Sequence, residues 1–235
     1  MLNSPGWAVA LKGDRFDLED LEQWLKPPFD PWMELLMGED GALTRLLRSK
    51  SWASLTEASD VTRDAERLVE RLHGAALLLQ SDAQPVQVGE VILFDQAGKR
   101  KPIIFAASGT IRICGGRVRG RVSSNAPPPP PTESEMQKWS READTDDTRS
   151  ELLSHVARAD NWFDLYKAME LARRIAGVNA VRVLAQDESE WRRIWQTANC
   201  YRHAPDPVKF PLPSPPADFE PSRAFLLRVL PRFLV

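Results

Sequence analysis

The chain has 235 residues, of which 31 are basic and 33 are acidic, so its formal net charge is −2. This near balance argues against a protein that is basic over its whole surface, although it leaves room for local basic patches. The hydrophobic fraction of 43% and the charged fraction of 27% are typical of folded proteins rather than of disordered chains.

Cysteine content and apolar runs exclude further classes. Cys114 and Cys200 are the only cysteines and lie far apart, so the sequence predicts neither a disulfide framework nor a zinc site. No apolar run approaches the roughly 20 residues that cross a bilayer, and the start, MLNSPGWAVALKGD, lacks the pattern of a secretory signal. We therefore expect a cytoplasmic protein with no membrane contact, no cofactor and no bound metal.

The first 124 residues are expected to form an α+β domain with a small antiparallel sheet. Apolar alternation with a period of two predicts strands, and apolar residues three or four apart predict helices. We expect strands at 7–11, 33–37, 42–47, 86–93, 103–106, 110–114 and 117–123, and helices at 16–25 and from about residue 59 onward. The GEDG sequence after residue 37 favours a hairpin there, with a helix as the alternative. The second helix either ends at Gly74 or continues to Leu79.

A basic hairpin is the most specific local prediction. Gly115-Gly116 lies between two alternating segments, which is typical of a two-residue hairpin turn. In the register that this turn sets, four arginines share one face: Arg112, Arg117, Arg119 and Arg121. Like charges directly opposite destabilise a strand pair by a few tenths to about 1 kcal/mol, so this face suggests an anionic partner such as RNA or another polyanion. The alternative is a hydrated surface that carboxylates elsewhere neutralise.

Five consecutive prolines, Pro127 to Pro131, are expected to separate the two halves of the chain. Proline fixes φ at about −65° and has no N–H donor, so the run favours a stiff polyproline II spacer. The charged segment up to Arg149 contains few large apolar residues besides Met136 and Trp139, and we expect it to continue the linker with a transient helix. The predicted organisation is a domain at 1–124, a linker at 125–149 and a helical bundle at 150–235.

Apolar residues at helical spacing predict four helices in the second half. They are expected at residues 150–158, 162–176, 187–203 and 222–234. Asp160 or Asn161 suits the cap of the second helix, Gly177 its end, and Pro221 the first residue of the last. Four short helices can bury one shared core, so this half is predicted to be an all-α bundle.

Asn199, Arg202 and His203 are the candidate catalytic residues. They gather an amide, a guanidinium and an imidazole at the end of the third helix, where Asn199 and His203 share a face. In this interpretation Arg202 holds a phosphate and His203 moves a proton. The alternative is an ordinary helix terminus, where arginine and histidine interact favourably with the last carbonyl groups.

The remaining candidates have simpler interpretations. His73 is expected at a helix terminus, and His155 is expected to be a packed side chain. Cys200 is interpreted as a small buried apolar residue rather than a nucleophile. Trp191 and Trp195 are four apart on a helix, which is more typical of a core than of a stacking platform.

A tyrosine-bearing helix (LYKAMELARRI, from Leu165) is followed by a helix ending in TANCYRHA, and this pair resembles bacterial HEPN-type helical domains. It also resembles an uncharacterised bacterial family with a TAN-x-x-RHA ending. The resemblance spans about Glu151 to Val235 and implies a small bundle that often dimerises. Many HEPN domains are ribonucleases of defence and toxin systems, with a catalytic arginine and histidine roughly four to six residues apart, and others bind without cleaving. Here Arg202 and His203 are adjacent and Arg193 lies too far upstream, which departs from the catalytic pattern.

We therefore expect a non-enzymatic protein of bacterial defence or stress. It would engage RNA, a protein partner or a second copy of itself through the basic hairpin and the helical domain. One alternative is a metal-independent ribonuclease that uses Asn199, Arg202 and His203. The other is a structural adaptor that joins an assembly through an exposed Trp139 and the proline-rich segments, without nucleic acid.

Overall fold

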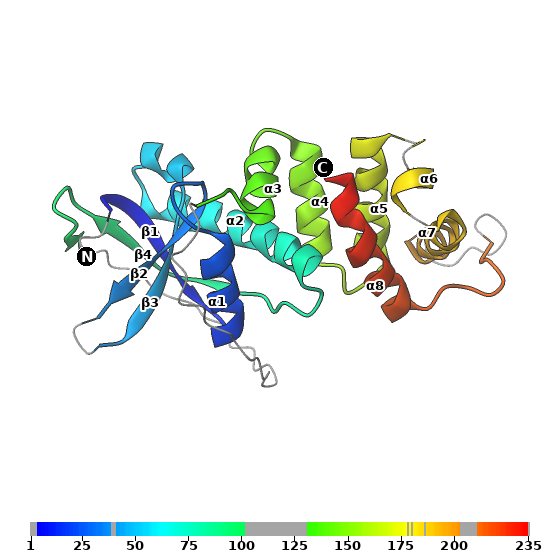
Figure 1. Ribbon diagram of the computed structural model, residues 1–235, viewed down its shortest axis with the longest axis horizontal. Coiled ribbons are helices and arrows are strands. Elements are labelled where there is room, and N and C mark those ends of the chain that lie inside the picture. Colours follow the sequence, from blue (N-terminus) through cyan, green and yellow to red (C-terminus); the bar gives the residue numbers. More distant parts are fainter. Residues whose placement is uncertain are drawn as a thin grey trace. The chain divides into compact units, whose positions relative to one another are not determined.

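The chain divides into two compact units in a computed structural model, which describes residues 4–38, 41–101, 131–177, 179, 181–185, 187–202 and 211–234. Unit 1 consists of Met1–Val69 and Gln84–Lys138, and unit 2 of Glu70–Ala83 and Trp139–Val235. Figure 1 shows the strands in unit 1 and a series of helices in unit 2. Residues 70–83, which the sequence analysis places in the first domain, belong to the helical unit.

The described residues of unit 1 form a five-stranded sheet in the order β2-β3-β1-β4-β5. Its strands are β1 (Gly6–Lys12), β2 (Trp32–Met37), β3 (Leu43–Arg48), β4 (Gln87–Phe94) and β5 (Arg100–Lys101). All neighbouring strands pair antiparallel. The prediction of a small antiparallel sheet is thereby confirmed, including the β2–β3 hairpin.

The central strand β1 is buried on both faces rather than half-buried as its alternation predicts. Val9 lies opposite Leu47 of β3, and both are fully buried. Ala8 and Ala10 point to the other face, where they form a second apolar cluster with Leu46, Ile92 and Phe94. The sequence pattern treats these alanines as small residues between the apolar positions of the strand, whereas both are buried in a core.

Residues 102–130 lie outside the described residues. They include the last three predicted strands, the Gly115-Gly116 turn and most of the proline run. Arg112, Arg117, Arg119 and Arg121 also lie there. The basic hairpin therefore stays a prediction.

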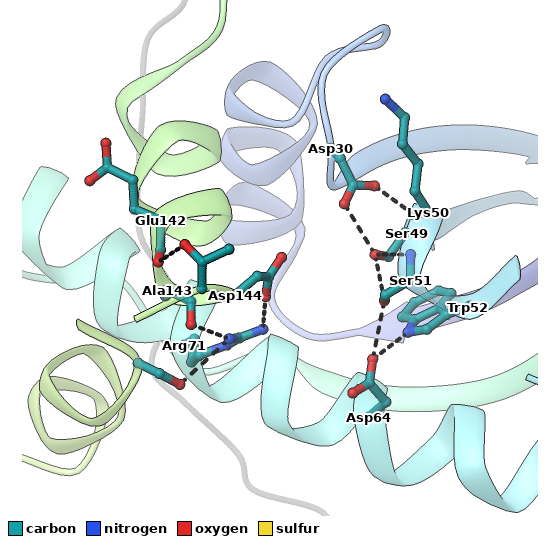
Figure 2. A network of polar contacts seen from close by, with 12 residues as sticks. Asp30, Ser49, Lys50, Ser51, Trp52, Asp64, Arg71, Glu142, Ala143 and Asp144 are labelled. Atoms are coloured by element: carbon teal, nitrogen blue, oxygen red, sulfur yellow. Dashed lines mark hydrogen bonds and ion pairs between the residues drawn. The ribbon is translucent and has the colours of Figure 1, made fainter. Parts of the chain in front are cut away.

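Capping and a buried tryptophan define the helices of unit 1. The Asp14 side chain accepts a hydrogen bond of 2.8 Å from the Phe16 amide at the start of α1 (Arg15–Trp24). A 3-10 helix, η1 (Lys50–Ser54), places Trp52 in the core, and the Trp52 Nε1 donates to Asp64 of α2 (Ala58–Leu79) at 2.8 Å. Figure 2 shows this contact beside the bond from the Lys50 amide to Asp30.

The segment predicted as a linker with a transient helix contains a packed helix, α3 (Glu135–Ala143). Met136 and Trp139 on it are at most 3% exposed, so the adaptor alternative is wrong in expecting an exposed Trp139. Gln137 is also fully buried. Its Nε2 lies 2.9, 3.1 and 2.9 Å from the carbonyl oxygens of Lys26, Phe29 and Pro31, respectively. The start of α3 is thus tied to the loop after α1 within unit 1.

Among the described residues of unit 2 the regular elements are all helices, as predicted. Besides the end of α2, unit 2 contains α4 (Asp147–Ala157), α5 (Trp162–Ala176), α6 (Val181–Leu184), α7 (Glu188–Arg202), α8 (Phe219–Val229) and a 3-10 turn, η3 (Leu230–Phe233). Asn161 caps α5 by accepting from the Asp164 amide, and Gly177 ends it with φ 84°. The four-residue α6 was not predicted, since it is too short to show a period.

Helix α2 continues through Gly74 to Leu79, and Gly74 lies where α2 closely approaches α4. A Cβ atom on Gly74 would lie 2.0 Å from the carbonyl oxygen of Leu153, so no larger residue fits without a shift of the backbone. Near it, Arg71 of α2 donates to the carbonyl of Ala143 and to the carboxylate of Asp144 (Figure 2). The glycine that suggested a helix end is therefore a packing residue.

Candidate functional site

The structure describes two of the three predicted catalytic residues. Asn199 and Arg202 lie partly buried at the end of α7, and His203 lies outside the described residues. Arg202 is directed towards α5, where its guanidinium carbon lies 4.2 Å from the centroid of the Tyr166 ring and its Nη1 lies 3.9 Å from a carboxylate oxygen of Glu170. The joint site of all three residues therefore stays a prediction, whereas the contacts of Arg202 with α5 are observed.

Two arginines and two aromatic residues form a continuous row of contacts, and successive members of the row come from α7 and α5 in turn. We call Arg202, Tyr166, Trp195 and Arg173 the Arg–aromatic row. The Tyr166 and Trp195 ring centroids are 4.6 Å apart, and the Arg173 guanidinium lies 5.6 Å from the Trp195 ring. On each helix the aromatic residue precedes the arginine by seven positions, about two turns, which places both on one face. The row both packs α5 against α7 and carries charge along it.

The carboxylate of Glu170 partly neutralises the positive charge of the Arg–aromatic row. The Lys167 Nζ lies 2.9 Å from a Glu170 carboxylate oxygen. That hydrogen bond, together with the charges of Lys167, Arg202 and Arg174, lowers the pKa of Glu170 below its usual value. Glu170 is therefore ionised at neutral pH and partly balances Arg202.

A pocket of about 240 Å³ lies at the Arg173 end of the row. We call it the arginine pocket. Its lining residues are Arg173, Asn179, Val181, Arg182, Glu188, Trp191, Arg192 and Trp195. Glu188 is the one carboxylate among these lining residues; it accepts from Arg192 at 2.6 Å and lies 3.6 Å from Arg182. Arg173 supplies a third guanidinium group to the lining.

Trp191 and Trp195 form the aromatic wall of the arginine pocket, and packing within unit 2 supports it. Trp191 is buried, and its ring stacks on Phe233 with centroids 5.3 Å apart and planes at 15°. Trp195 is partly exposed and contacts Tyr166 and Arg173. Trp191 is therefore the core residue that its helical spacing predicts, while Trp195 also faces the pocket. Aromatic walls beside several guanidinium groups suit a planar, anionic ligand.

The other titratable groups of unit 2 lie outside the arginine pocket. The Nδ1 of His155 lies 2.7 Å from a carboxylate oxygen of Asp164, whose other oxygen accepts from Asn161 at 2.7 Å, so His155 is a packed, paired side chain as predicted. Burial, together with the nearby charge of Arg223, lowers the pKa of His73 to about 4. Cys200 is 1% exposed, in agreement with its interpretation as an apolar residue.

No cluster of three or more metal-ligating side chains occurs among the described residues. Within the same parts of the chain, no helix is both long enough and apolar enough to cross a bilayer.

Comparison of the chain with models of known protein families, with curated proteins and with solved structures gives no match. The resemblance to HEPN domains stays a prediction, so the function is argued from the site itself. Sequence reasoning missed the arginine pocket. Its one sequence signal is the aromatic residue seven positions before an arginine, which occurs in both α5 and α7.

Proposed function

We propose that this chain is a non-enzymatic protein that binds single-stranded RNA on its helical unit. The arginine pocket and the Arg–aromatic row that leads to it carry this proposal. The predicted basic hairpin, with Arg112, Arg117, Arg119 and Arg121, would add contacts to phosphates.

The chemistry of the surface matches the two requirements of single-strand recognition. Proteins that bind unpaired RNA combine cationic groups along the backbone with aromatic rings on which bases stack. Arg173, Arg182 and Arg192 supply the cations, and the partly exposed Trp195 supplies the ring. A guanidinium group stays charged and offers five N–H donors in a planar fork that fits phosphate oxygens.

The contacts of Arg202 favour binding over cleavage. Its guanidinium is already directed to the Tyr166 ring and towards Glu170, which suits a residue that shapes the surface. A ribonuclease of the resembled type would use this arginine on the scissile phosphate, with His203 as acid or base. The adjacency of Arg202 and His203 departs from that arrangement.

Titration of a labelled RNA tests the binding function. A fluorescent single-stranded oligonucleotide of about 12 nucleotides, a length within the usual single-strand site sizes, is titrated with the full chain and followed by anisotropy. Affinity should fall steeply as the salt concentration rises. In a plot of the logarithm of the association constant against the logarithm of the salt concentration, each phosphate contacted contributes about −0.7 to the slope. Because the bases of a duplex are stacked on one another and are not available to aromatic side chains, a duplex of the same sequence should compete poorly.

Charge reversal locates the binding surface. The double variant Arg173→Glu with Arg192→Glu should bind at least about tenfold more weakly, since it reverses two of the three pocket cations. A control for a single charge reversal is Arg228→Glu on α8, an exposed arginine that also lies 5.5 Å from an aromatic ring but does not line the pocket. Equal losses in both variants, or no binding by the wild type, would overturn the proposal.

The same RNA separates the binding protein from the ribonuclease alternative. After prolonged incubation the oligonucleotide should be intact on a denaturing gel with the wild type and with His203→Ala. Cleavage by the wild type that His203→Ala abolishes would instead establish the ribonuclease.

A further inference from the structure

The size of the arginine pocket limits what it can hold. Pockets for drug-sized ligands measure about 300–1,000 Å³, and a water molecule occupies about 30 Å³ of the liquid. A volume of about 240 Å³ therefore suits one nucleotide or part of one, and not two stacked nucleotides.

The charge of the pocket distinguishes the ligand further. Glu188 offers one carboxylate to Arg192 and Arg182, while Arg173 adds a third guanidinium, so positive charge remains in excess. An internal phosphodiester carries one negative charge. A terminal phosphomonoester carries about −1.5 to −2 at pH 7 and has three acceptor oxygens. The pocket is thus better matched to a strand end than to an internal linkage.

The positions of the aromatic wall and of the exposed arginines are also compatible with the base and the phosphate of one nucleotide. Trp191 and Trp195 lie one turn apart on α7 and form the aromatic wall, while Arg182 and Arg192 extend into solvent with side chains 73% and 65% exposed. Arg173 and Trp195 belong to both the pocket and the Arg–aromatic row. A strand whose last nucleotide occupies the pocket can therefore continue along the row.

We infer that the arginine pocket recognises the phosphorylated end of a single-stranded RNA, with the terminal base against Trp195 and the phosphomonoester bound by Arg182 and Arg192. This inference rests on the proposed RNA-binding function. The shared chemistry is a nucleotide phosphomonoester, which occurs at a 5′ or at a 3′ end.

Three oligonucleotides of one sequence test the inference. One carries a 5′-phosphate, one a 3′-phosphate and one hydroxyl groups at both ends, and each is titrated with the full chain at the same salt concentration. One of the phosphorylated strands should bind about tenfold more tightly than the strand without a terminal phosphate. The preferred strand identifies the end that is recognised.

Conservative variants place the preference in the pocket. Arg182→Gln removes a charge from an exposed side chain and should weaken binding of the phosphorylated strand at least about threefold more than binding of the unphosphorylated strand. Arg228→Gln, outside the pocket, should leave the preference unchanged.

The outcomes separate the inference from the function on which it rests. Equal affinity for all three strands would overturn recognition of the end and leave RNA binding intact. A preference that Arg182→Gln and the double variant Arg182→Gln with Arg192→Gln both retain would overturn the assignment to this pocket. If none of the three strands bound, the proposed function itself would fail.

Discussion

Arg48 in unit 1 and the arginines around the pocket of unit 2 have opposite roles. The Arg48 side chain is 2% exposed, and its guanidinium donates to the backbone carbonyls of Ser4, Gly6 and Trp7 at 2.6–3.2 Å. It also pairs with Glu34 at 3.0 Å. Backbone acceptors and burial make this arginine part of the fold.

The arginines around the pocket of unit 2 are in the opposite situation. Arg182 and Arg192 extend into solvent, and the side chain that pairs with both is the single carboxylate of Glu188. A guanidinium has five N–H donors, so one shared carboxylate leaves donors for a ligand. Burial and the kind of acceptor, rather than the residue type, therefore distinguish a structural arginine from a candidate binding residue.

The largest effect is expected for Arg48→Met in unit 1. The substitution leaves the Glu34 carboxylate and three carbonyl groups without their cationic donor, and breaking such a buried pair destabilises proteins by about 3–5 kcal/mol. Urea denaturation followed by circular dichroism measures the free energy of unfolding.

The control is Arg100→Met in the same unit. Arg100 also pairs with a glutamate, Glu90, but its side chain is 52% exposed, and surface substitutions of this kind usually change stability by less than about 0.5 kcal/mol. If Arg48→Met were as mild as this control, the assignment of Arg48 to the fold would be wrong.

The next largest loss of stability is expected at Gln137, whose amide nitrogen lies among three carbonyl oxygens. Gln137→Glu keeps the shape of the side chain but replaces this donor by an oxygen that repels all three. We expect a loss of about 3 kcal/mol in the free energy of unfolding, since an unsatisfied buried group that is charged costs more than a neutral one. Gln87→Glu makes the same change at an exposed position of β4 and should have little effect. A match between the two variants in their urea midpoints would contradict the role of Gln137.

The contacts of Gln137 also explain why the sequence predicted part of the fold and missed α3. Strand β1 and helix α5 have local signals: a period of two, or a period near four with an Asn161 cap and a Gly177 stop. Helix α3 has one apolar pair, and its remaining support comes from carbonyl groups more than a hundred residues away in the chain. Such long-range hydrogen bonds leave no periodic trace.

The candidate site likewise has a part that the sequence predicts and a part that only tertiary contacts create. The spacing of Tyr166 with Arg173 and of Trp195 with Arg202 is visible in the sequence, but the packing of α5 on α7 that joins them is a tertiary contact. The arginine pocket further needs Arg182 on the four-residue α6, which is too short for a periodic signal. Residue types at one helix end could therefore be identified as candidates, whereas the pocket could not.

A pH-dependent effect of intermediate size is expected from His73 in unit 2. Burial, with the charge of Arg223, lowers the pKa of His73 from the usual 6.5 to about 4, so the folded state favours the neutral ring. The unfolded state takes up a proton below pH about 6.5, and the stability linked to this group is present above that pH and is lost as the pH falls towards 4. The shift corresponds to at most roughly 3 kcal/mol.

Urea midpoints at pH about 7 and pH about 4.5 measure this loss. Carboxylates titrate over part of the same range, so the informative quantity is the difference between the wild type and His73→Leu. The variant should lose less stability on acidification than the wild type does. Identical pH profiles for the two proteins would show that His73 does not make unit 2 sensitive to acid.

The smallest effect on stability and the sharpest test of the comparison come from Arg182→Ala and Arg192→Ala. Both side chains are mostly exposed, so each variant should unfold within about 0.5 kcal/mol of the wild type. Each should nevertheless weaken the binding of single-stranded RNA severalfold, because fewer cations then face the phosphates. Removal of the buried Arg48 thus lowers folding stability, whereas removal of Arg182 or Arg192 lowers ligand affinity. If Arg182→Ala destabilised the chain as strongly as Arg48→Met, the arginines around the pocket would be structural, and the case for a ligand there would be lost.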